Sequence, residues 1–280
     1  MLDSILTFST SGPTLASGPT FSRLGSTKTN SSAVVPLQTQ MPEVRLLVSL
    51  ATYKERDNLA SLIHEIHAVL PTAEILVIDD NSPDGTGRLA DEIAAADSRI
   101  HVIHRPGKLG LGTATLAAMR YAMDKEYDFL VNMDADFSHH PRYLPAVLAG
   151  MKRKDVMIGS RYIRGGGTEN WPLTRKIVSL SVNGMVRLLM RIPAQDCSGA
   201  YRCYRVSKLR QTNLDHLLSR GYSFQQEVLF RCRRSGSRIG ETPIIFENRR
   251  AGASKVNLKE VVRSISILLW IGLHVFCGWE

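Results

Sequence analysis

An α/β fold built on a mostly parallel sheet is the fold class that the sequence predicts, and two observations predict it. From residue 44 onward, short apolar runs alternate with segments whose apolar residues recur at helical spacing. Polar residues follow these apolar runs directly, as happens where parallel strands end together at one edge of an open sheet. Alternation of this kind is typical of parallel strands joined by right-handed helical crossovers.

Four strands are expected in the first half of the chain, at residues 44–50, 75–78, 100–104 and 129–133. The first leads into a helix whose apolar residues lie at helical spacing from Leu59 to Leu70, and Pro71 ends it. The second run is fully apolar, which is typical of a strand buried on both faces of a parallel sheet. A turn-rich loop at 79–86 and a glycine-rich loop at 105–112 each precede a further helix.

The second half is expected to contribute shorter strands and two helices. Pro172 suits the first turn of a helix, where its missing N–H does no harm, and this helix continues to about Met190. Arg175 and Ser179 lie one turn apart on it, hence on one face. The other expected elements are a strand at 156–160, a helix from Tyr222 to about Arg234, a strand at 239–246 and a basic loop at 249–255.

The 280 residues divide into three parts by composition. Residues 1–40 are rich in Ser, Thr, Gly and Pro without any period, so this segment is predicted to be disordered. Residues 41–260 suit one large domain. Residues 261–280 are predicted to form an apolar C-terminal helix whose apolar run, about 12 residues, is too short to span a bilayer. This helix either lies at a membrane interface, which Trp270 and Trp279 would suit, or belongs to the core.

Charge and cysteine content narrow the classes of partner. The formal net charge of +9 favours phosphate-bearing substrates, an anionic membrane surface or nucleic acid. The sequence has no basic motif with interleaved aromatic residues, so no nucleic-acid partner is expected. Its four cysteines form no CxxC pair and no metal-finger spacing, and they are predicted to be reduced thiols in a cytosolic setting.

Two carboxylates, Asp134 and Asp136, follow the apolar run at 129–133. Residues i and i+2 of an extended chain point to the same side, so both can address one hard cation and a phosphate bound to it. An acidic pair at a strand end also serves solubility and turn formation in many proteins. Polar residues at the ends of the preceding strands favour the binding interpretation, because those ends meet at one edge. These residues are Tyr53, Asp79, Asp80 and Lys108.

Several other residues admit both a functional and a structural interpretation. His139 and His140 could bind a metal, but a polar pair that leads a helix before Pro141 is the favoured interpretation. The glycines of the loop at 105–112 resemble a phosphate cradle only loosely, and a strand-to-helix turn explains them equally well. Glu227 is compatible with either a catalytic or a structural role.

Five segments in a fixed order give the chain a specific resemblance. They are residues 77–86, 134–139, 159–162, 221–227 and 249–255. With these segments the sequence resembles the dolichol-phosphate and polyprenol-phosphate mannosyltransferases, which are family 2 glycosyltransferases. The resemblance runs from about Val44 to Lys255. It implies a GT-A type fold, in which a Rossmann-like, mostly parallel sheet is flanked by helices.

The resemblance also implies roles for individual residues and a divalent cofactor, Mg²⁺ or Mn²⁺. The residues implied to bind the nucleotide are Thr52, Tyr53, Glu55, Asp79 and Asp80, and those implied to hold the metal and diphosphate are Asp134, Asp136 and Ser138. The acceptor phosphate is implied to bind Arg161, Arg175 and Ser179. The donor diphosphate is implied to bind Arg249 and Lys255. Asp136, Arg161, Arg175 and Ser179 are the residues expected to act in catalysis. The chain departs from the family at Ala51 and Lys54, where relatives usually have Pro and Asn.

The implied activity is the transfer of mannose from GDP-mannose to a polyprenyl, or dolichyl, phosphate, with inversion. A phosphate monoester is largely dianionic at pH 7, so this acceptor needs positioning rather than a general base. The expected location is the cytoplasmic face of a membrane, with the protein peripheral or monotopic. Three alternatives stay open: a polyprenyl-phosphate glucosyltransferase, a nucleotidyltransferase, and a non-catalytic protein that binds nucleotide sugars.

Overall fold

The computed structural model describes residues 44–219, 221, 223–247 and 258–276. The strands are β1 (Leu46–Thr52), β2 (Glu74–Asp79), β3 (Ile100–His104), β4 (Phe129–Asp134), β5 (Val156–Ser160), β6 (Gly167–Thr168), β7 (Arg202–Arg205), β8 (Ile239–Pro243) and β9 (Ile245–Phe246). The helices are α1 (Arg56–Val69), α2 (Thr86–Ala96), α3 (Leu111–Asp124), the 3₁₀ helix η1 (Pro141–Tyr143), α4 (Leu144–Gly150), α5 (Leu173–Met190), α6 (Val206–Leu209), α7 (Phe224–Arg234) and α8 (Leu258–Phe276).

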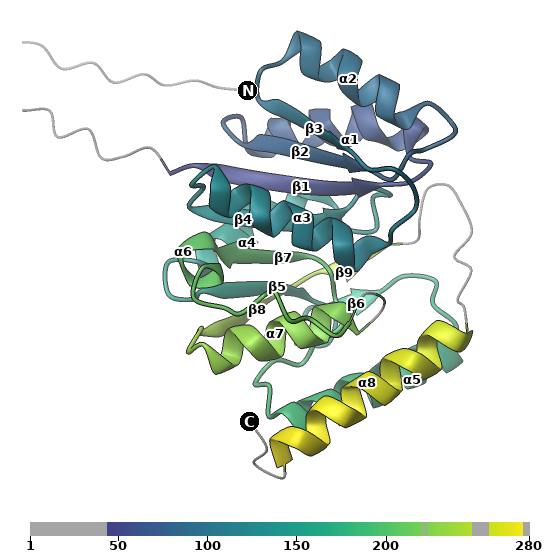
Figure 1. Cartoon of the computed structure of the whole chain (residues 1–280), viewed down its shortest axis with the longest axis vertical. Coiled ribbons are helices and arrows are strands. Elements are labelled where there is room, and N and C mark those ends of the chain that lie inside the picture. The colour runs from purple at the N-terminus through teal and green to yellow at the C-terminus, as the bar shows by residue number, and fades with distance from the viewer. Residues whose placement is uncertain (1–43, 220, 222, 248–257, 277–280) are drawn as a thin grey trace, which may run out of the picture. The chain divides into compact units, whose positions relative to one another are not determined.

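Seven of the described strands form one sheet in the order β3-β2-β1-β4-β7-β5-β8 (Figure 1). β3, β2, β1 and β4 run parallel to one another, and β5 runs parallel to β8. β7 is antiparallel to both β4 and β5. The predicted mostly parallel sheet is therefore confirmed, with one reversed strand inside it. The short strands β6 and β9 form a separate parallel pair.

The pairing of the parallel strands brings their polar ends together. Ala51 of β1 pairs with Asp134 of β4, and Thr52 of β1 pairs with Asp79 of β2. The loops that follow these three strands therefore start side by side at the carboxyl edge of the sheet. Open α/β sheets bind their ligands at this edge.

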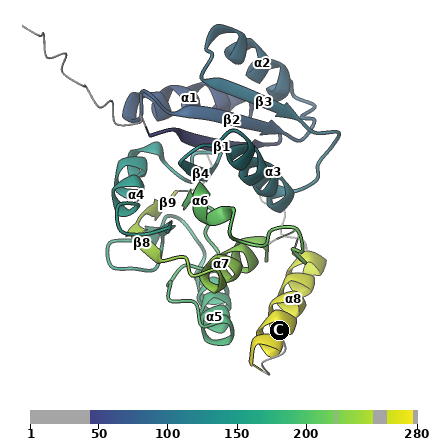
Figure 2. The ribbon, with the colours of Figure 1, turned by 60° about the vertical axis from the view of Figure 1, so that its left-hand side comes forward.

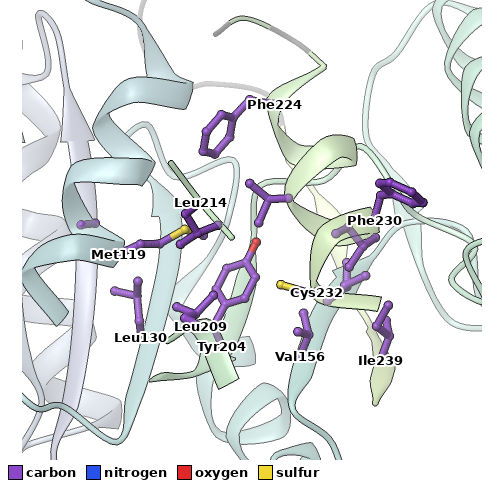
Figure 3. Close-up of a cluster of buried hydrophobic side chains, with 14 of the residues drawn as sticks. Met119, Leu130, Val156, Tyr204, Leu209, Leu214, Phe224, Phe230, Cys232 and Ile239 are labelled. Carbon is purple, nitrogen blue, oxygen red and sulfur yellow. The ribbon is translucent and has the colours of Figure 1, made fainter. Parts of the chain in front are cut away.

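Successive strand residues face opposite sides of the sheet and belong to two separate hydrophobic layers. Leu47 packs with the layer under α3, α5, α6, α7 and α8, whereas Val48 packs with the layer under α1, α2 and α4. Figure 2 shows the helices on both faces of the sheet. In Figure 3, Tyr204 of β7 lies in the middle of the first layer, between Met119 of α3 and Cys232 of α7.

Pro243 divides the strand that the sequence predicts at residues 239–246. A proline has no N–H to give to a strand ladder, and β8 ends at this residue. Ile244 still donates its backbone N–H to the carbonyl of Ser160, at 3.0 Å. The chain then continues as β9, which pairs with β6 instead of extending the main sheet.

The C-terminal helix α8 begins at Leu258, a few residues before the predicted start, and packs beside α5 (Figure 1). Leu268 and Ile271 are buried in the first hydrophobic layer, whereas Trp270 and Leu273 are 51% and 56% exposed. The helix thus contributes to the core and also presents apolar side chains to the outside. In the part of the chain that the structure describes, no helix combines the length and apolar character needed to cross a membrane.

Asp155, whose side chain is buried, joins the second half of the sheet through ion pairs with Arg205 and Arg238. It lies directly before β5, and its carboxylate accepts hydrogen bonds from Arg238 N at 2.9 Å, Arg238 Nε at 3.0 Å and Arg205 Nε at 3.2 Å. The hydrogen bond from Arg238 is the main cause that lowers the pKa of Asp155 to about 2. The residue therefore holds the ends of β5, β7 and β8 together as an anion.

We predict that Asp155→Asn lowers the free energy of unfolding at pH 7 by about 1 to 2 kcal/mol, a range that allows for solvent screening of the exposed Arg238. A lowered pKa stabilises the folded state above the ordinary value of 3.8, and this stability is lost as the pH falls through about 2. Urea unfolding at several pH values should show a smaller decline between pH 4 and pH 2 in the variant. An equal decline in both proteins would contradict this role.

Candidate active site

A cleft of about 270 Å³ opens at the carboxyl edge of the sheet, beside the ends of β1, β2 and β4 and the start of α3. Six of the residues predicted from the sequence line it: Thr52, Tyr53, Glu55, Asp80, Asp134 and Asp136. Lys108 also lines it, with its Nζ 4.3 Å from the centre of the Tyr53 ring. The strand-end pattern had placed Lys108 at this edge, although it was not among the residues assigned a role.

The loops that follow β1, β2 and β4 each contain a non-glycine residue in the left-handed backbone region. Lys54 has a φ of 65°, Asn81 of 55° and Phe137 of 65°. L-residues adopt this conformation at a cost, and residues held in it cluster at functional sites because the surrounding structure enforces it. Asparagine tolerates the conformation better than lysine. The departure from the family pattern at Lys54 therefore places a costlier residue at a position that favours Asn.

Asp79 and Asp80 have different surroundings. Asp79 is buried and accepts hydrogen bonds from Thr52 Oγ1 at 2.9 Å, Ser82 N at 2.9 Å and Ser82 Oγ at 2.5 Å, so it joins the loops after β1 and β2. Asp79 does not line the cleft, so its predicted contact with the nucleotide stays a prediction.

Asp80 lines the cleft and holds the glycine-rich loop in place. Its carboxylate accepts from Arg105 Nε at 2.5 Å, Leu109 N at 3.1 Å and Gly110 N at 3.2 Å. Gly110 has a φ of +92°, which glycine adopts readily. Two backbone N–H groups of this loop are thus directed at Asp80. This geometry favours the strand-to-helix turn over the phosphate cradle.

Asp134 and Asp136 both reach the cleft, and their neighbours fix them differently. Asp136 is buried and accepts hydrogen bonds from the backbone N–H of Ser138, at 3.0 Å, and from its hydroxyl. The side chain of Asp134 is 26% exposed. Its backbone N–H donates to Nδ1 of His139 at 3.0 Å.

The two histidines are structural in this arrangement. His139 is buried, stacks on Tyr201 at 5.1 Å between ring centres and supports the backbone of Asp134. His140 caps the helix η1 by accepting from Arg142 N at 3.2 Å, which confirms the favoured interpretation for this residue. Among the described residues, no group of three or more His, Cys, Asp or Glu side chains is arranged to hold a metal ion.

The donor set at the cleft fits a hard divalent cation that shares its coordination with a substrate. Asp134 and Asp136 offer carboxylate oxygens only, and oxygen ligands suit Mg²⁺ and Mn²⁺. Mg²⁺ is commonly held by one or two carboxylates together with substrate phosphates rather than by a protein cage. Ser138 is fully buried, does not line the cleft and donates its hydroxyl to Asp136. Its direct ligation of the metal stays a prediction.

The residues predicted to bind the acceptor form a second group. Arg161 lies directly after β5 and Arg175 lies in the first turn of α5, and both guanidinium groups contact the ring of Trp171. The hydroxyl of Tyr162 donates to Ser179 Oγ at 2.6 Å, which joins the segment after β5 to α5. The structure therefore brings Arg161, Arg175 and Ser179 together.

Arg161 is held by Asp196, a residue that the sequence reasoning did not select. Its Nε donates to Asp196 Oδ2 and its Nη2 to Asp196 Oδ1, both at 2.7 Å, and Nη2 also donates to Ser198 Oγ at 2.8 Å. Burial alone would raise the pKa of Asp196, but Arg161 more than offsets this and lowers it. Burial opposes the charge of Arg161, yet its hydrogen bonds to Asp196 and the negative charges of Asp196 and Asp134 raise its pKa. Both side chains are therefore charged.

The remaining residues that the sequence singled out are Glu227, Arg249 and Lys255. Glu227 is buried and accepts from the backbone N–H groups of Leu218 and Ser219, and it pairs with Arg231 at 2.8 Å, so its role is structural. Arg249 and Lys255 lie outside the described residues. Asp196 carried no strand-end or motif signal, because its role depends on a contact with Arg161 from a distant segment.

Comparison with known proteins decides the family. The model of glycosyl transferase family 2 matches residues 48–212. The chain belongs to this family. It is 42% identical over 214 residues to an undecaprenyl-phosphate mannosyltransferase of Micrococcus luteus, covering 76% of this chain and 88% of that protein. It is also 42% identical over 236 residues to a polyprenol monophosphomannose synthase of Mycolicibacterium smegmatis, covering 81% and 88%. The resemblance drawn from the motifs is confirmed, and the protein is a glycosyltransferase.

A solved structure confirms the fold. Glucosyl-3-phosphoglycerate synthase from Mycobacterium tuberculosis, determined with Mn²⁺, UDP and glucosyl-3-phosphoglycerate, superposes with a TM-score of 0.58. The comparison covers 85% of this glycosyltransferase and 81% of that chain, at 18% sequence identity. A likeness at this identity establishes the GT-A type fold alone.

The left-handed backbone at Lys54 leads to a stability prediction for this glycosyltransferase. Lys54→Asn should raise the free energy of unfolding by about 1 kcal/mol, because Asn adopts a positive φ at a lower cost. Chemical denaturation measures the difference. Lys125→Asn is the matched control, since Lys125 is exposed and has a φ of −91°. Equal effects of the two substitutions, or destabilisation at residue 54, would contradict the prediction.

Proposed function

We propose that this glycosyltransferase transfers mannose from GDP-mannose to a polyprenyl phosphate, with inversion, at the cytoplasmic face of a membrane. The observation that carries the proposal is that the two groups of residues predicted to bind phosphate lie near each other, since the carboxylate of Asp134 acts on the charge of Arg161. Asp134 and Asp136 face a cleft large enough for part of a nucleotide, and Arg161 and Arg175 lie together on another part of the chain. The names of the two relatives, both of which specify mannose and a polyprenyl carrier, support the choice of substrates.

Mg²⁺ or Mn²⁺ is the cofactor that the cleft would hold, through Asp134 and Asp136. When bound, a divalent cation stabilises the negative charge that develops on a diphosphate leaving group. The structural neighbour from Mycobacterium tuberculosis was determined with Mn²⁺ and UDP, and separately with Mg²⁺ and UDP. Lys108, which lines the same cleft, adds a positive charge beside the predicted nucleotide residue Tyr53.

The chemistry requires one displacement at the anomeric carbon of mannose. An oxygen of the acceptor phosphate forms a bond to this carbon as the bond to the GDP oxygen breaks, and the configuration inverts. The acceptor is largely dianionic at neutral pH, so no proton has to be removed. Arg161 and Arg175 supply charge-assisted hydrogen bonds that orient the phosphate. Both carboxylate oxygens of Asp196 accept hydrogen bonds from Arg161, and the acceptor phosphate has no proton to give up in this step. We therefore assign Asp196 a positioning role.

Exposed apolar side chains on α5 and α8 support the membrane part of the proposal. Leu173, Ile177, Leu180 and Leu188 recur at helical spacing on α5 and are 72%, 55%, 51% and 79% exposed. On the neighbouring α8, Leu269, Trp270 and Leu273 are also exposed. An amphipathic helix surface of this kind suits the interface of a bilayer, where the isoprenoid tail of the acceptor stays. The excess of basic residues adds attraction to anionic lipids.

A transfer assay tests the proposed activity. Purified enzyme is incubated with a polyprenyl phosphate, Mg²⁺ and radiolabelled GDP-mannose, GDP-glucose or UDP-glucose in parallel. We expect labelled lipid from GDP-mannose, and Asp136→Asn should reduce it at least about a hundred-fold, because it removes one of the two carboxylates that would hold the cation. The melting temperature controls for folding. Label transferred from UDP-glucose in preference to GDP-mannose, or no transfer from any donor, would refute the proposal.

Vesicle binding tests the membrane surface separately. Leu173→Glu combined with Leu188→Glu should release the protein from phosphatidylglycerol vesicles in a sedimentation assay, because two charges cannot enter the apolar layer without a large cost. Val44→Glu is the matched control, since Val44 is 59% exposed at the opposite edge of the sheet. Unchanged sedimentation of the double variant, or equal release of the control, would contradict a membrane role for α5.

A further inference from the structure

Trp171 lies between the two arginines that are proposed to bind the acceptor. The guanidinium carbon of Arg175 is 3.8 Å from the centre of a Trp171 ring, and that of Arg161 is 5.4 Å away. Both distances are within the range of a cation–π interaction, and tryptophan is the side chain that attracts cations most strongly. One indole therefore holds two positive groups that come from separate segments of the chain.

The surroundings of Trp171 fix the orientation of its ring. It follows Asn170, which has a φ of 53°, and precedes Pro172, the residue that caps α5. Phe246 of β9 meets the indole edge-on, at 5.4 Å between ring centres, and Phe246 itself is held by its pairing with Thr168 of β6. The side chain is only 8% exposed. A ring fixed in this way can set the positions of both guanidinium groups.

The indole N–H lacks the partner that a buried donor requires. Nε1 of Trp171 is shielded from solvent, and no group in the described part of the chain accepts a hydrogen bond from it. A buried donor without an acceptor destabilises the folded state, so it indicates that a ligand completes the site. Two arginines beside the donor select an anionic oxygen as that ligand.

We propose that Trp171 is a further acceptor-binding residue, whose ring positions Arg161 and Arg175 and whose indole N–H donates to an oxygen of the bound phosphate monoester. This inference rests on the proposed function in one respect, namely that the acceptor is a phosphate. It adds a neutral N–H donor beside the two arginines. Asp196 completes the arrangement from the other side, because it holds the Arg161 guanidinium through two hydrogen bonds of 2.7 Å.

Kinetics of Trp171→Phe test the hydrogen bond, because phenylalanine keeps an aromatic face and lacks the N–H. The KM for a short-chain polyprenyl phosphate should rise about ten-fold, the effect of losing one hydrogen bond to a charged group. The KM for GDP-mannose should stay within about two-fold. Trp171→Leu, which also removes the aromatic face, should raise the acceptor KM further. Tyr127→Phe is the control: it removes an aromatic donor, which bonds Glu74 at 2.6 Å, at the other edge of the sheet.

Fluorescence gives a readout that needs no turnover. The chain has three tryptophans, so Trp270→Phe with Trp279→Phe leaves Trp171 as the reporter. Its emission should change saturably with a short-chain isoprenyl phosphate and stay unchanged with the matching isoprenol, which has no phosphate. Adding Arg175→Ala to this protein should raise the half-saturating concentration.

Two results would overturn the inference. One is an acceptor KM of Trp171→Phe equal to that of the wild type, and the other is the same emission change with the isoprenol as with its phosphate. Failure of the proposed function would look different. In that case no labelled mannose reaches a polyprenyl phosphate, while the titration of Trp171 with the isoprenyl phosphate still decides whether this residue senses a phosphate.

Discussion

The register of three neighbouring parallel strands determines where the polar residues of this glycosyltransferase meet. Ala51 pairs with Asp134 and Thr52 with Asp79, so the loops after β1, β2 and β4 leave the sheet at the same level. A slip of one residue in any of these strands would turn its buried side chains to the opposite face, and the two hydrophobic layers oppose such a slip. The packing of the core thus fixes the cleft, and the strained loop residues at its rim depend on that support.

A second constraint acts on the arginine side of the site. Arg161 and Asp196 are both buried, and charges removed from water require good geometry and further hydrogen bonds to be tolerated. Asp196 meets this condition because it also accepts from Gly199 N at 2.9 Å, and its own N–H donates to Glu241 at 2.9 Å. Glu241 belongs to β8, so the arginine is anchored to the sheet through the side chain of Asp196, the backbone N–H of Asp196 and the side chain of Glu241. Such an anchor lets a flexible residue type present a fixed charge to a substrate.

The sequence was sufficient to predict the alternating strands, the mostly parallel sheet and the carboxylates at its carboxyl edge, because these depend on local periodicity and on strand ends. It could not predict that Asp196 or Trp171 contacts Arg161, because both contacts depend on how separate segments of the chain fold onto one another. It also left Glu227 and the glycine-rich loop undecided. The role of each depends on which group accepts hydrogen bonds from nearby backbone N–H groups. Glu227 accepts from residues 218 and 219, and Asp80 accepts from residues 109 and 110.

The central claim is that the carboxylates at the ends of these strands hold a divalent cation against the diphosphate of the donor. Crystals grown with Mn²⁺ and GDP, measured near the manganese absorption edge, test it most directly through an anomalous difference map. We expect one strong peak in the cleft, roughly 2.2 Å from a carboxylate oxygen of Asp134 or Asp136 and in contact with the GDP phosphates. GDP bound in the cleft without a manganese peak, or a peak away from these two carboxylates, would contradict it.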